Sequence, residues 1–345
     1  MKRSAILIAL VFGSAFARGQ GATPPPVQLT QSSPRNIGKL KLPAGFRLGP
    51  VIPGLNEGGV PQGLAYLKDQ DSILISLYFE DGQASMISII SDKTGKLTKS
   101  LALVDENDSP HKGHVGGIAV SKKYLWVGSD RLYRVPLSDV SKAKAIDVLR
   151  LKPAFATESK TAYLACSEQV LWVGEFVLDK DPKANPAHHL KDRDGQPRDA
   201  WVSGYVLDEQ DDAKAKGLAA NDPLPPDFVL AVRSKVQGIA FLRNQVCLSI
   251  SYGRNNPSKL TVFRNPLATE KGRPHQMVKM QNGTIVPVWF LDGKNRIKEI
   301  AYPPMSEGIV PCKNGFAVIC ESGAKKYRKG AKHEPLDYVV RIPAP

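Results

Sequence analysis

The polar residues that stand at the ends of apolar segments are the residues in this chain best suited to chemistry. Carboxylates and histidines in such places could act as general acid and base, or could hold a zinc or calcium ion. Amides, tyrosines and an arginine in equivalent places could bind a ligand by hydrogen bonds and stacking. The residues that we expect to bind a ligand are Gln62, Tyr78, Glu175, Gln237, Tyr252, Arg254, Glu307 and Glu321.

Two histidines share one polar segment and offer acid–base or metal chemistry. His111 and His114 are spaced as His-x-x-His, and with Glu307 they are the candidate catalytic residues. Imidazole together with carboxylate suits zinc or a similar ion, and the three glutamates with backbone carbonyls would suit calcium equally. One histidine acting as a hydrogen-bonding or acid–base group without a metal is a further alternative. The candidate metal ligands are His114, Glu175, Glu307 and Glu321.

The elements that must position these residues are short apolar segments that recur along the chain. The clearest is Val236 to Leu242, which is followed by a polar turn and a second apolar run. Variants begin near Pro61, Val115, Lys160 and Ser306. Repetition of strands and turns without long helical patterns indicates a β-propeller, in which each segment is the innermost strand of one blade. The predicted fold is therefore all-β, a single β-propeller.

The spacing of the repeats predicts the number of blades and the way in which the ring closes. We expect five blades, or six if Ala268 to Leu291 contains another. A strand around Phe46 to Leu48 is expected to complete the last blade, so that an N-terminal strand closes the ring. The run Ala145 to Leu151 is expected to be the outer strand of the second blade.

This geometry predicts which polar residues share a site. The first strand of a blade starts on the face where the antiparallel second strand ends, so both ends should surround one mouth of the channel. A concave site with convergent polar groups is the default hypothesis for a ligand site, although hydrogen-bonded side chains and water could simply fill the mouth. The long insert Leu178 to Ala200 is expected on the same face, where it could cap the mouth.

The chain is expected to have three parts. Residues 1–17 are typical of an export signal, with Lys2 and Arg3 before an apolar segment and a small-x-small site at its end. Residues 18–44 are expected to be a flexible tether, and residues 45–345 the propeller domain. The expected location is secreted or periplasmic, with no transmembrane segment after the signal is removed.

Composition limits the partners. The chain has 47 basic and 33 acidic residues, a formal net charge of +14. We interpret this charge mainly as solubilising, with an anionic surface as the alternative partner, and the scattered lysines do not favour nucleic acid. A monomer is expected. The four cysteines are expected to be buried free thiols, because Cys312 and Cys320 flank a hairpin turn at unequal distances and should not face one another.

The repeats resemble a family of secreted bacterial β-propeller proteins to which no activity is assigned. The resemblance covers most of the chain from Gly45 onward and implies a secreted propeller. A looser resemblance, in architecture, is to lactonase-like and strictosidine-synthase-like propellers, which typically hold an axial calcium with an acidic residue and asparagines; this chain has no asparagine at the matching strand starts. The segments that carry the first resemblance are Val60 to Tyr66, Ser109 to Ala119, Val236 to Arg254, Pro303 to Glu307 and Glu321 to Ala324.

Two functions follow from these features as hypotheses. In the first, the propeller is a binding scaffold that recognises a small molecule, glycan or peptide at the channel mouth. In the second, it is a metal-dependent hydrolase or lyase, similar to a lactonase, with its site at the same mouth. The chain lacks a serine nucleophile motif, a phosphate loop and a dinucleotide fingerprint.

Overall fold

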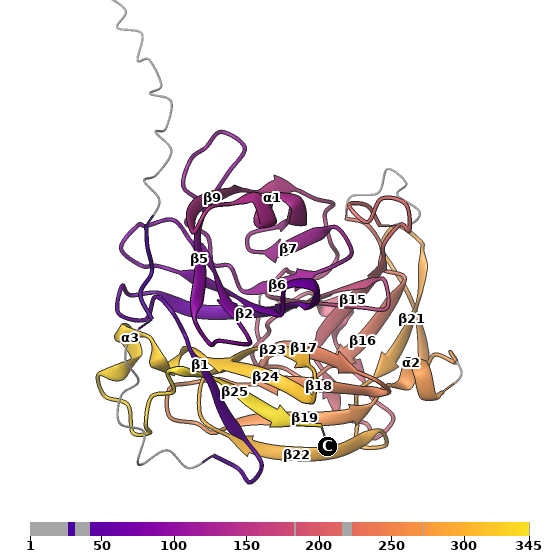
Figure 1. Ribbon diagram of the computed structural model, residues 1–345. Coiled ribbons are helices and arrows are strands. Elements are labelled where there is room, and N and C mark those ends of the chain that lie inside the picture. The colour runs from indigo at the N-terminus through magenta and orange to yellow at the C-terminus, as the bar shows by residue number, and fades with distance from the viewer. Residues whose placement is uncertain (1–26, 32–41, 183, 216–222, 271, 345) are drawn as a thin grey trace, which may run out of the picture.

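The computed structural model describes residues 27–31, 42–182, 184–215, 223–270 and 272–344, which form five blades around one axis (Figure 1). The predicted all-β propeller and its five blades are confirmed. The innermost strands are consecutive neighbours around the ring, and the last also packs against the first. They are β2 (Val60–Leu67), β6 (Gly117–Val120), β11 (Tyr163–Ser167), β17 (Val236–Leu242) and β23 (Ser306–Cys312).

Each blade is a twisted sheet whose strands follow from the axis outward. Blade one continues with β3 (Ser72–Tyr78), β4 (Met86–Ser91), β5 (Leu97–Val104) and β9 (Ile146–Arg150). Blade two continues with β7 (Tyr124–Gly128), β8 (Leu132–Pro136) and β10 (Lys152–Pro153). Blade three continues with β12 (Val170–Gly174), β15 (Ala200–Val206), β16 (Phe228–Val232), β21 (Ile285–Phe290) and β20 (Gln276–Lys279). Blade four continues with β18 (Gln245–Ile250), β19 (Ser258–Arg264) and β22 (Arg296–Tyr302). Blade five continues with β24 (Gly315–Cys320), β25 (Tyr338–Pro343) and β1 (Arg47–Val51).

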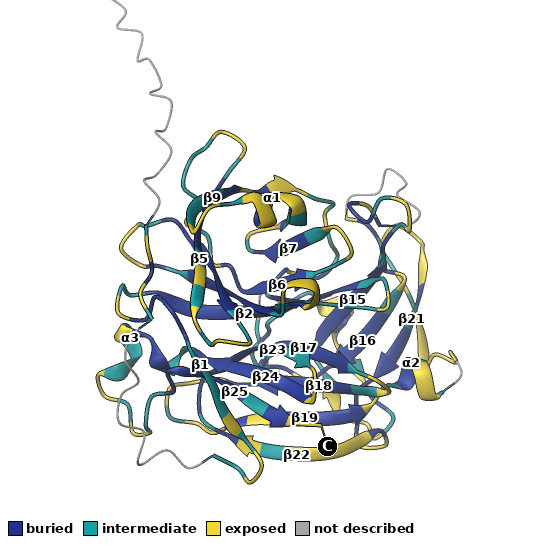
Figure 2. Ribbon diagram, in the orientation of Figure 1, coloured by how far each residue is buried: buried dark blue, intermediate teal, exposed yellow. Residues whose placement is uncertain are grey.

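The ring closes as predicted, because β1 pairs antiparallel with β25 and places Leu48 opposite Val340. Strands from both ends of the chain therefore share one sheet, which ties the last blade to the first part of the domain. The strand bodies form the buried layer between blades, while turns and outer strands are exposed (Figure 2).

The outer strand predicted for blade two lies in blade one instead. Strand β9 pairs parallel with β5, with Leu101 opposite Asp147. The short helix α1 (Leu137–Lys142) follows β8 and carries the chain across to the neighbouring sheet. This connection replaces the tight hairpin that would have kept the strand in blade two, whose edge is the two-residue β10.

The segment predicted as a site for a sixth blade extends blade three. Strand β21 pairs parallel with β16, with Leu230 opposite Trp289, and β20 pairs antiparallel with β21. Its apolar residues have a partner surface there, since Val288 and Phe290 pack with Trp201 in one buried cluster. Among the described residues, no helix is long and apolar enough to cross a membrane.

Part of the segment expected to be a tether packs on the domain. Leu29 is 1% exposed and its backbone N–H donates to Ser100 Oγ at 3.1 Å. Gln31 donates to the carbonyls of Val51 and Gly95 and accepts from the N–H of Leu97. Residues 27–31 are therefore held to blade one by burial and hydrogen bonds. The expected export signal and the rest of the expected tether up to residue 41 lie outside the described residues.

Candidate functional site

The glycine that recurs in the inner strands brings these strands into close contact. A Cβ atom on Gly117 would lie 2.4 Å from the backbone nitrogen of Leu164, and one on Gly308 would lie 2.6 Å from that of Leu64. A side chain at either position would thus collide with the backbone of the next blade. These contacts narrow the channel between two ends, which differ in chemistry.

The polar end is the mouth predicted from the strand ends, and amide–carboxylate pairs lie there. Gln62 Nε2 donates to Glu321 Oε2 at 3.1 Å, and Gln237 Nε2 donates to Glu307 Oε1 at 3.0 Å. Each pair joins neighbouring elements around the axis, because β2 and β17 flank β23 on its two sides. These four side chains thus lie at one end of the channel, as the strand ends predict, and each pair spans two blades.

The two glutamates of this end both have raised pKa values, mainly because they are buried. Glu307 is 3% exposed, and burial, with the nearby Glu321 carboxyl adding to it, raises its pKa well above the usual range. Burial also raises the pKa of Glu321, although Lys326, Gln62 and Tyr327 oppose this effect. A buried carboxyl whose pKa is raised remains protonated in a range where a free one is ionised. In its protonated form Glu307 would carry one O–H donor at this end of the channel.

A short segment after β24 covers the polar end and supplies residues that the repeat pattern did not reveal. It comprises η3 (Glu321–Gly323) and α3 (Lys325–Arg328). Lys326 Nζ donates to Tyr78 Oη at 2.6 Å and lies 2.6 Å from Glu80 Oε1. Arg254 lies over the Tyr327 ring at 5.0 Å. Since Lys326 and Tyr327 lie outside the repeat, the basic run after Glu321 was the only signal of their role.

Each of the two candidate catalytic histidines contacts an aromatic ring, His114 that of Tyr78 and His111 that of Tyr133. The ring of His114 lies 4.4 Å from that of Tyr78, and His111 Nε2 lies 3.1 Å from Ser129 Oγ. Burial lowers the pKa of both, aided at His114 by Lys326 and opposed at His111 by Asp130 and Asp105. Both imidazoles are therefore neutral near pH 7, the form that can accept a proton.

Glu175, one of the predicted site residues, is bound within blade three instead. Its Oε1 lies 2.7 Å from His188 Nδ1 and accepts from the N–H of Trp201 at 2.9 Å. Burial alone would lower the pKa of His188, but hydrogen bonds to Glu158 and Glu175 outweigh burial and raise it. His188 belongs to η2 (Pro186–His188) and stacks on Trp201 at 4.0 Å. The insert expected to cap the mouth is thereby fastened to its own blade.

Tyr252, another predicted ligand residue, is 51% exposed at the edge of the polar end. Its ring lies 6.5 Å from that of Phe176, and Lys235 Nζ lies 5.8 Å from its centroid. These two neighbours place Tyr252 at the rim of this end, apart from the amide–carboxylate pairs.

Among the described residues, the four predicted metal ligands are not brought together as one group within 4.8 Å. Glu175 is taken up by His188, and His114 stacks on Tyr78. In the described part of the chain, one group of acidic or ligating side chains lies within 4.8 Å, namely Asp192, Asp194 and Asp292. Arg198 pairs with Asp192 at 2.6 Å and Arg193 with Asp292 at 2.7 Å, so this group forms a network of ion pairs beside the hairpin of β13 (Leu190–Lys191) and β14 (Pro197–Arg198).

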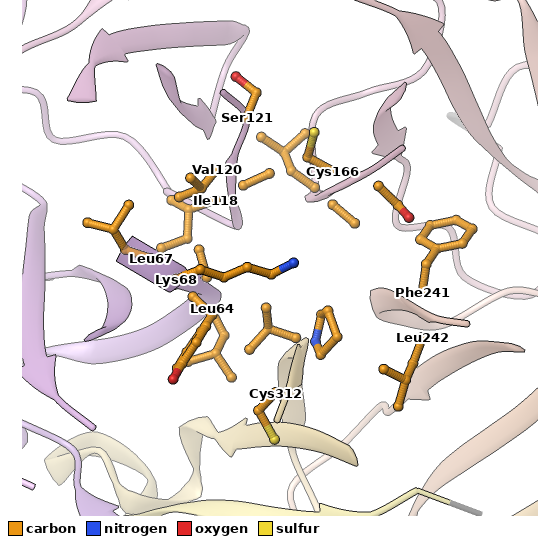
Figure 3. A pocket seen from close by; sticks show the side chains of 18 of the residues that line it. Leu64, Leu67, Lys68, Ile118, Val120, Ser121, Cys166, Phe241, Leu242 and Cys312 are labelled. Carbon is orange, nitrogen blue, oxygen red and sulfur yellow. The ribbon is translucent and has the colours of Figure 1, made fainter. Parts of the chain in front are cut away.

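The large cavity of the domain lies at the opposite end of the channel, where the inner strands end and turn. Its volume is about 830 Å³. Figure 3 shows its wall, to which all five blades contribute. At equivalent positions, each inner strand supplies one branched aliphatic residue, and two residues later a second lining residue. The first set is Leu64, Ile118, Leu164, Ile239 and Ile309, and the second is Tyr66, Val120, Cys166, Phe241 and Pro311.

The rim of this cavity is charged, and its charges recur with the same period. Four residues after each aliphatic position, the hairpin turns contribute a further lining residue. These are Lys68, Lys122, Glu168, Arg243 and Lys313. Asp69 also lies at the rim, so four basic residues stand against two acidic ones. Sequence reasoning missed this site because it followed the other ends of the same strands, although the recurrent basic residue after each inner strand was visible.

All four cysteines are free thiols, as expected, but the expected burial is wrong for two of them. Cys247 and Cys320 are buried, whereas Cys166 and Cys312 are half-buried and line the cavity. Burial, with a smaller contribution from Asp212, raises the pKa of Cys166 to about 12, so its thiol is a poor nucleophile at neutral pH.

Comparison with known proteins adds similarity of architecture only. No protein-family model matches the chain, and no curated protein is similar to it at a significant level. Among solved structures, the RRP9 WD40 repeats are 12% identical over 86% of this chain and 97% of theirs, with a TM-score of 0.40. A gluconolactonase from Xanthomonas campestris is 12% identical over 88% of this chain and 87% of its own, with a TM-score of 0.34. A hydrazine synthase chain from Kuenenia stuttgartiensis is 9% identical over 75% of this chain, with a TM-score of 0.33. The match covers 55% of that chain, so this chain spans about half of its length. The chain is a five-bladed β-propeller, and similarities at this level carry no argument about its activity.

Proposed function

We propose that this protein is a binding scaffold that holds a small organic molecule in the cavity at the turn end of its channel. The observation that carries this proposal is the size and composition of the cavity. Its volume of about 830 Å³ falls in the range of about 300–1,000 Å³ typical of small-molecule sites, which are mostly apolar with a few polar groups. In this cavity the aliphatic side chains form the wall and the charged groups stand at the rim.

The composition of the wall favours a small molecule over the glycan or peptide that the sequence left open. A glycan would need many polar side chains along the wall, whereas the serines there are Ser121 and Ser167. The hydroxyl of Tyr66 is already bonded to Asp71 and Asp92. We retain the expectation that the protein acts outside the cytoplasm as part of this proposal, because its N-terminal segment is typical of an export signal.

Filling the cavity should abolish binding. Val120 is half-buried in the wall, and Val120→Trp would place an indole in the space that a ligand needs. We expect the neutral dye N-phenylnaphthylamine to gain fluorescence with the natural protein, and its affinity to fall at least about tenfold in the variant, the equivalent of ~1.4 kcal/mol. Ile285→Trp, at the exposed first residue of β21, is the matched control and should bind the dye normally. Equal binding by Val120→Trp and the natural protein would contradict the proposal, provided that thermal unfolding shows both to be folded.

A second candidate function, a hydrolase or lyase acting at the polar end, is supported by one observation. The polar end holds both a carboxyl with a raised pKa, Glu307, and an imidazole with a lowered pKa, His114, and these are the protonation states of a general acid and a general base. Hydrolysis of simple lactones would then be lost in Glu307→Gln and in His114→Ala while dye binding in the cavity persists. Turnover that survives both changes, or that Val120→Trp removes, would rule out this assignment.

A further inference from the structure

We infer that the ligand of the turn-end cavity is an amphipathic organic anion, with an apolar body inside the cavity and a carboxylate, sulfonate or phosphate group at the basic rim. This inference rests on the proposed function, because it names the chemical class of the molecule that the scaffold holds. It depends on three features of the described residues: the recurrence of basic residues at the rim, the lack of partners for three of them, and the apolar wall beneath them.

The rim is basic by repetition. Lys68, Lys122, Arg243 and Lys313 occupy the same position in four different hairpin turns, and blade three has Glu168 there. Four turns from separate parts of the chain thus converge on one opening. Because Asp69 and Glu168 are the acidic residues at the same opening, the rim has an excess of positive charge, which attracts anions from solution.

Three of these four basic side chains are available to a ligand. Lys313 lies 3.2 Å from Asp71 Oδ1. Lys68, Lys122 and Arg243 make no ion pair or side-chain hydrogen bond within the part of the chain that the structure describes. Figure 3 shows the Lys68 side chain extending over the cavity with its nitrogen toward the middle. An anion at that point would therefore find an unpaired ammonium group directly above the apolar wall.

The wall below selects for an apolar body. The five aliphatic positions nearest the narrow part of the channel, together with Val120 and Phe241, leave little side-chain hydrogen bonding for a polar molecule. A hydrated inorganic anion could contact the rim, but it would gain nothing from this wall. An amphipathic anion satisfies both parts, since burial of its body supplies most of the binding and the exposed charge contributes a smaller part that depends on salt.

Two dyes with the same aromatic body test the charge separately from the cavity. Anilinonaphthalene sulfonate carries one sulfonate, and N-phenylnaphthylamine is its neutral counterpart. We expect the natural protein to bind the sulfonate about tenfold more tightly at about 20 mM salt and to lose most of this preference at about 200 mM. In the double variant Lys68→Gln/Arg243→Gln, the sulfonate dye should bind no more tightly than the neutral dye. The affinity of the neutral dye should be the same as with the natural protein.

The controls distinguish failure of this inference from failure of the proposed function. Lys279→Gln with Arg273→Gln removes the same charges from the exposed outer edge of blade three and should leave both affinities unchanged. Octanoate should displace the sulfonate dye, whereas inorganic phosphate at the same concentration should not. Equal affinity for both dyes, both lost in Val120→Trp, would overturn the anion inference and leave the scaffold intact. Binding of neither dye, or binding insensitive to Val120→Trp, would overturn both. Displacement by phosphate alone would mean that the rim is a simple anion site.

Discussion

Gly117→Val should lower the free energy of unfolding by about 3 kcal/mol or more, the upper part of the range for overpacked positions. The added Cβ would lie 2.4 Å from the Leu164 nitrogen and 2.6 Å from the Tyr163 Cα. Both are backbone atoms of the neighbouring inner strand, so no side chain can rotate away. The blades would have to separate around the whole ring, and chemical denaturation followed by circular dichroism would measure the loss.

A second position and a control show whether close contact is the cause. Gly308→Val should have a similar effect, because a Cβ atom there would lie 2.6 Å from the Leu64 nitrogen and 2.7 Å from the Gln62 carbonyl oxygen. Gly95→Asn should be tolerated, since that turn has open space and asparagine accepts its positive φ of 69°. If Gly117→Val were as stable as Gly95→Asn, the inner strands would have to stand further apart than described.

Glu307→Gln should make the protein more stable than the natural chain at alkaline pH and should flatten its dependence on pH. Burial and the Glu321 carboxyl raise the pKa of Glu307 in the folded state. The folded state therefore binds a proton more tightly than the unfolded chain. The stability associated with this proton is fully present below the unfolded pKa and is lost as the pH rises through the folded pKa. Glutamine carries no charge at any pH, and its oxygen can still accept from Gln237.

Unfolding in urea between about pH 5 and about pH 8 would measure this effect, and at the upper end we expect the variant to be more stable by roughly 1–3 kcal/mol. His188, whose pKa is also raised, contributes with the same sign in both proteins and cancels in the difference. Glu299→Gln is the control, and it should make the protein less stable than the natural chain at about pH 8. Lys259 lowers the pKa of Glu299, so its carboxylate form stabilises the folded state. A Glu307→Gln variant that is less stable than the natural protein at about pH 8 would show that Glu307 is held as a carboxylate.

The sequence predicted the parts of the fold in which local pattern and local pairing coincide. Inner strands such as β17 were visible because glycine and alternating apolar residues recur with a following turn. Hairpin neighbours pair with each other, so the position of each second strand followed directly. That Gln62, Gln237, Glu307 and Glu321 lie at one end of the channel followed from the same antiparallel geometry, whereas their pairing across neighbouring blades did not.

The parallel pairings were not predictable in this way. An apolar run such as Ile146 to Arg150 has a strand pattern, but nothing within it specifies whether β8 or β5 is its partner. The partner strand is decided by the sheet edge that remains uncovered after the other strands have assembled. The same reason explains β21, whose parallel partner β16 is far from it in the sequence.

The sequence by itself therefore determined a closed ring of five repeated blades and the polar groups gathered at one end of its channel. The tertiary structure alone decided that the large cavity lies at the other end, that Lys326 and Tyr327 cover the polar end, and that Glu175 is taken up by His188. The physical reason is that a strand pattern specifies which residues share a face, whereas the space left between five converging strands depends on how closely their backbones pack.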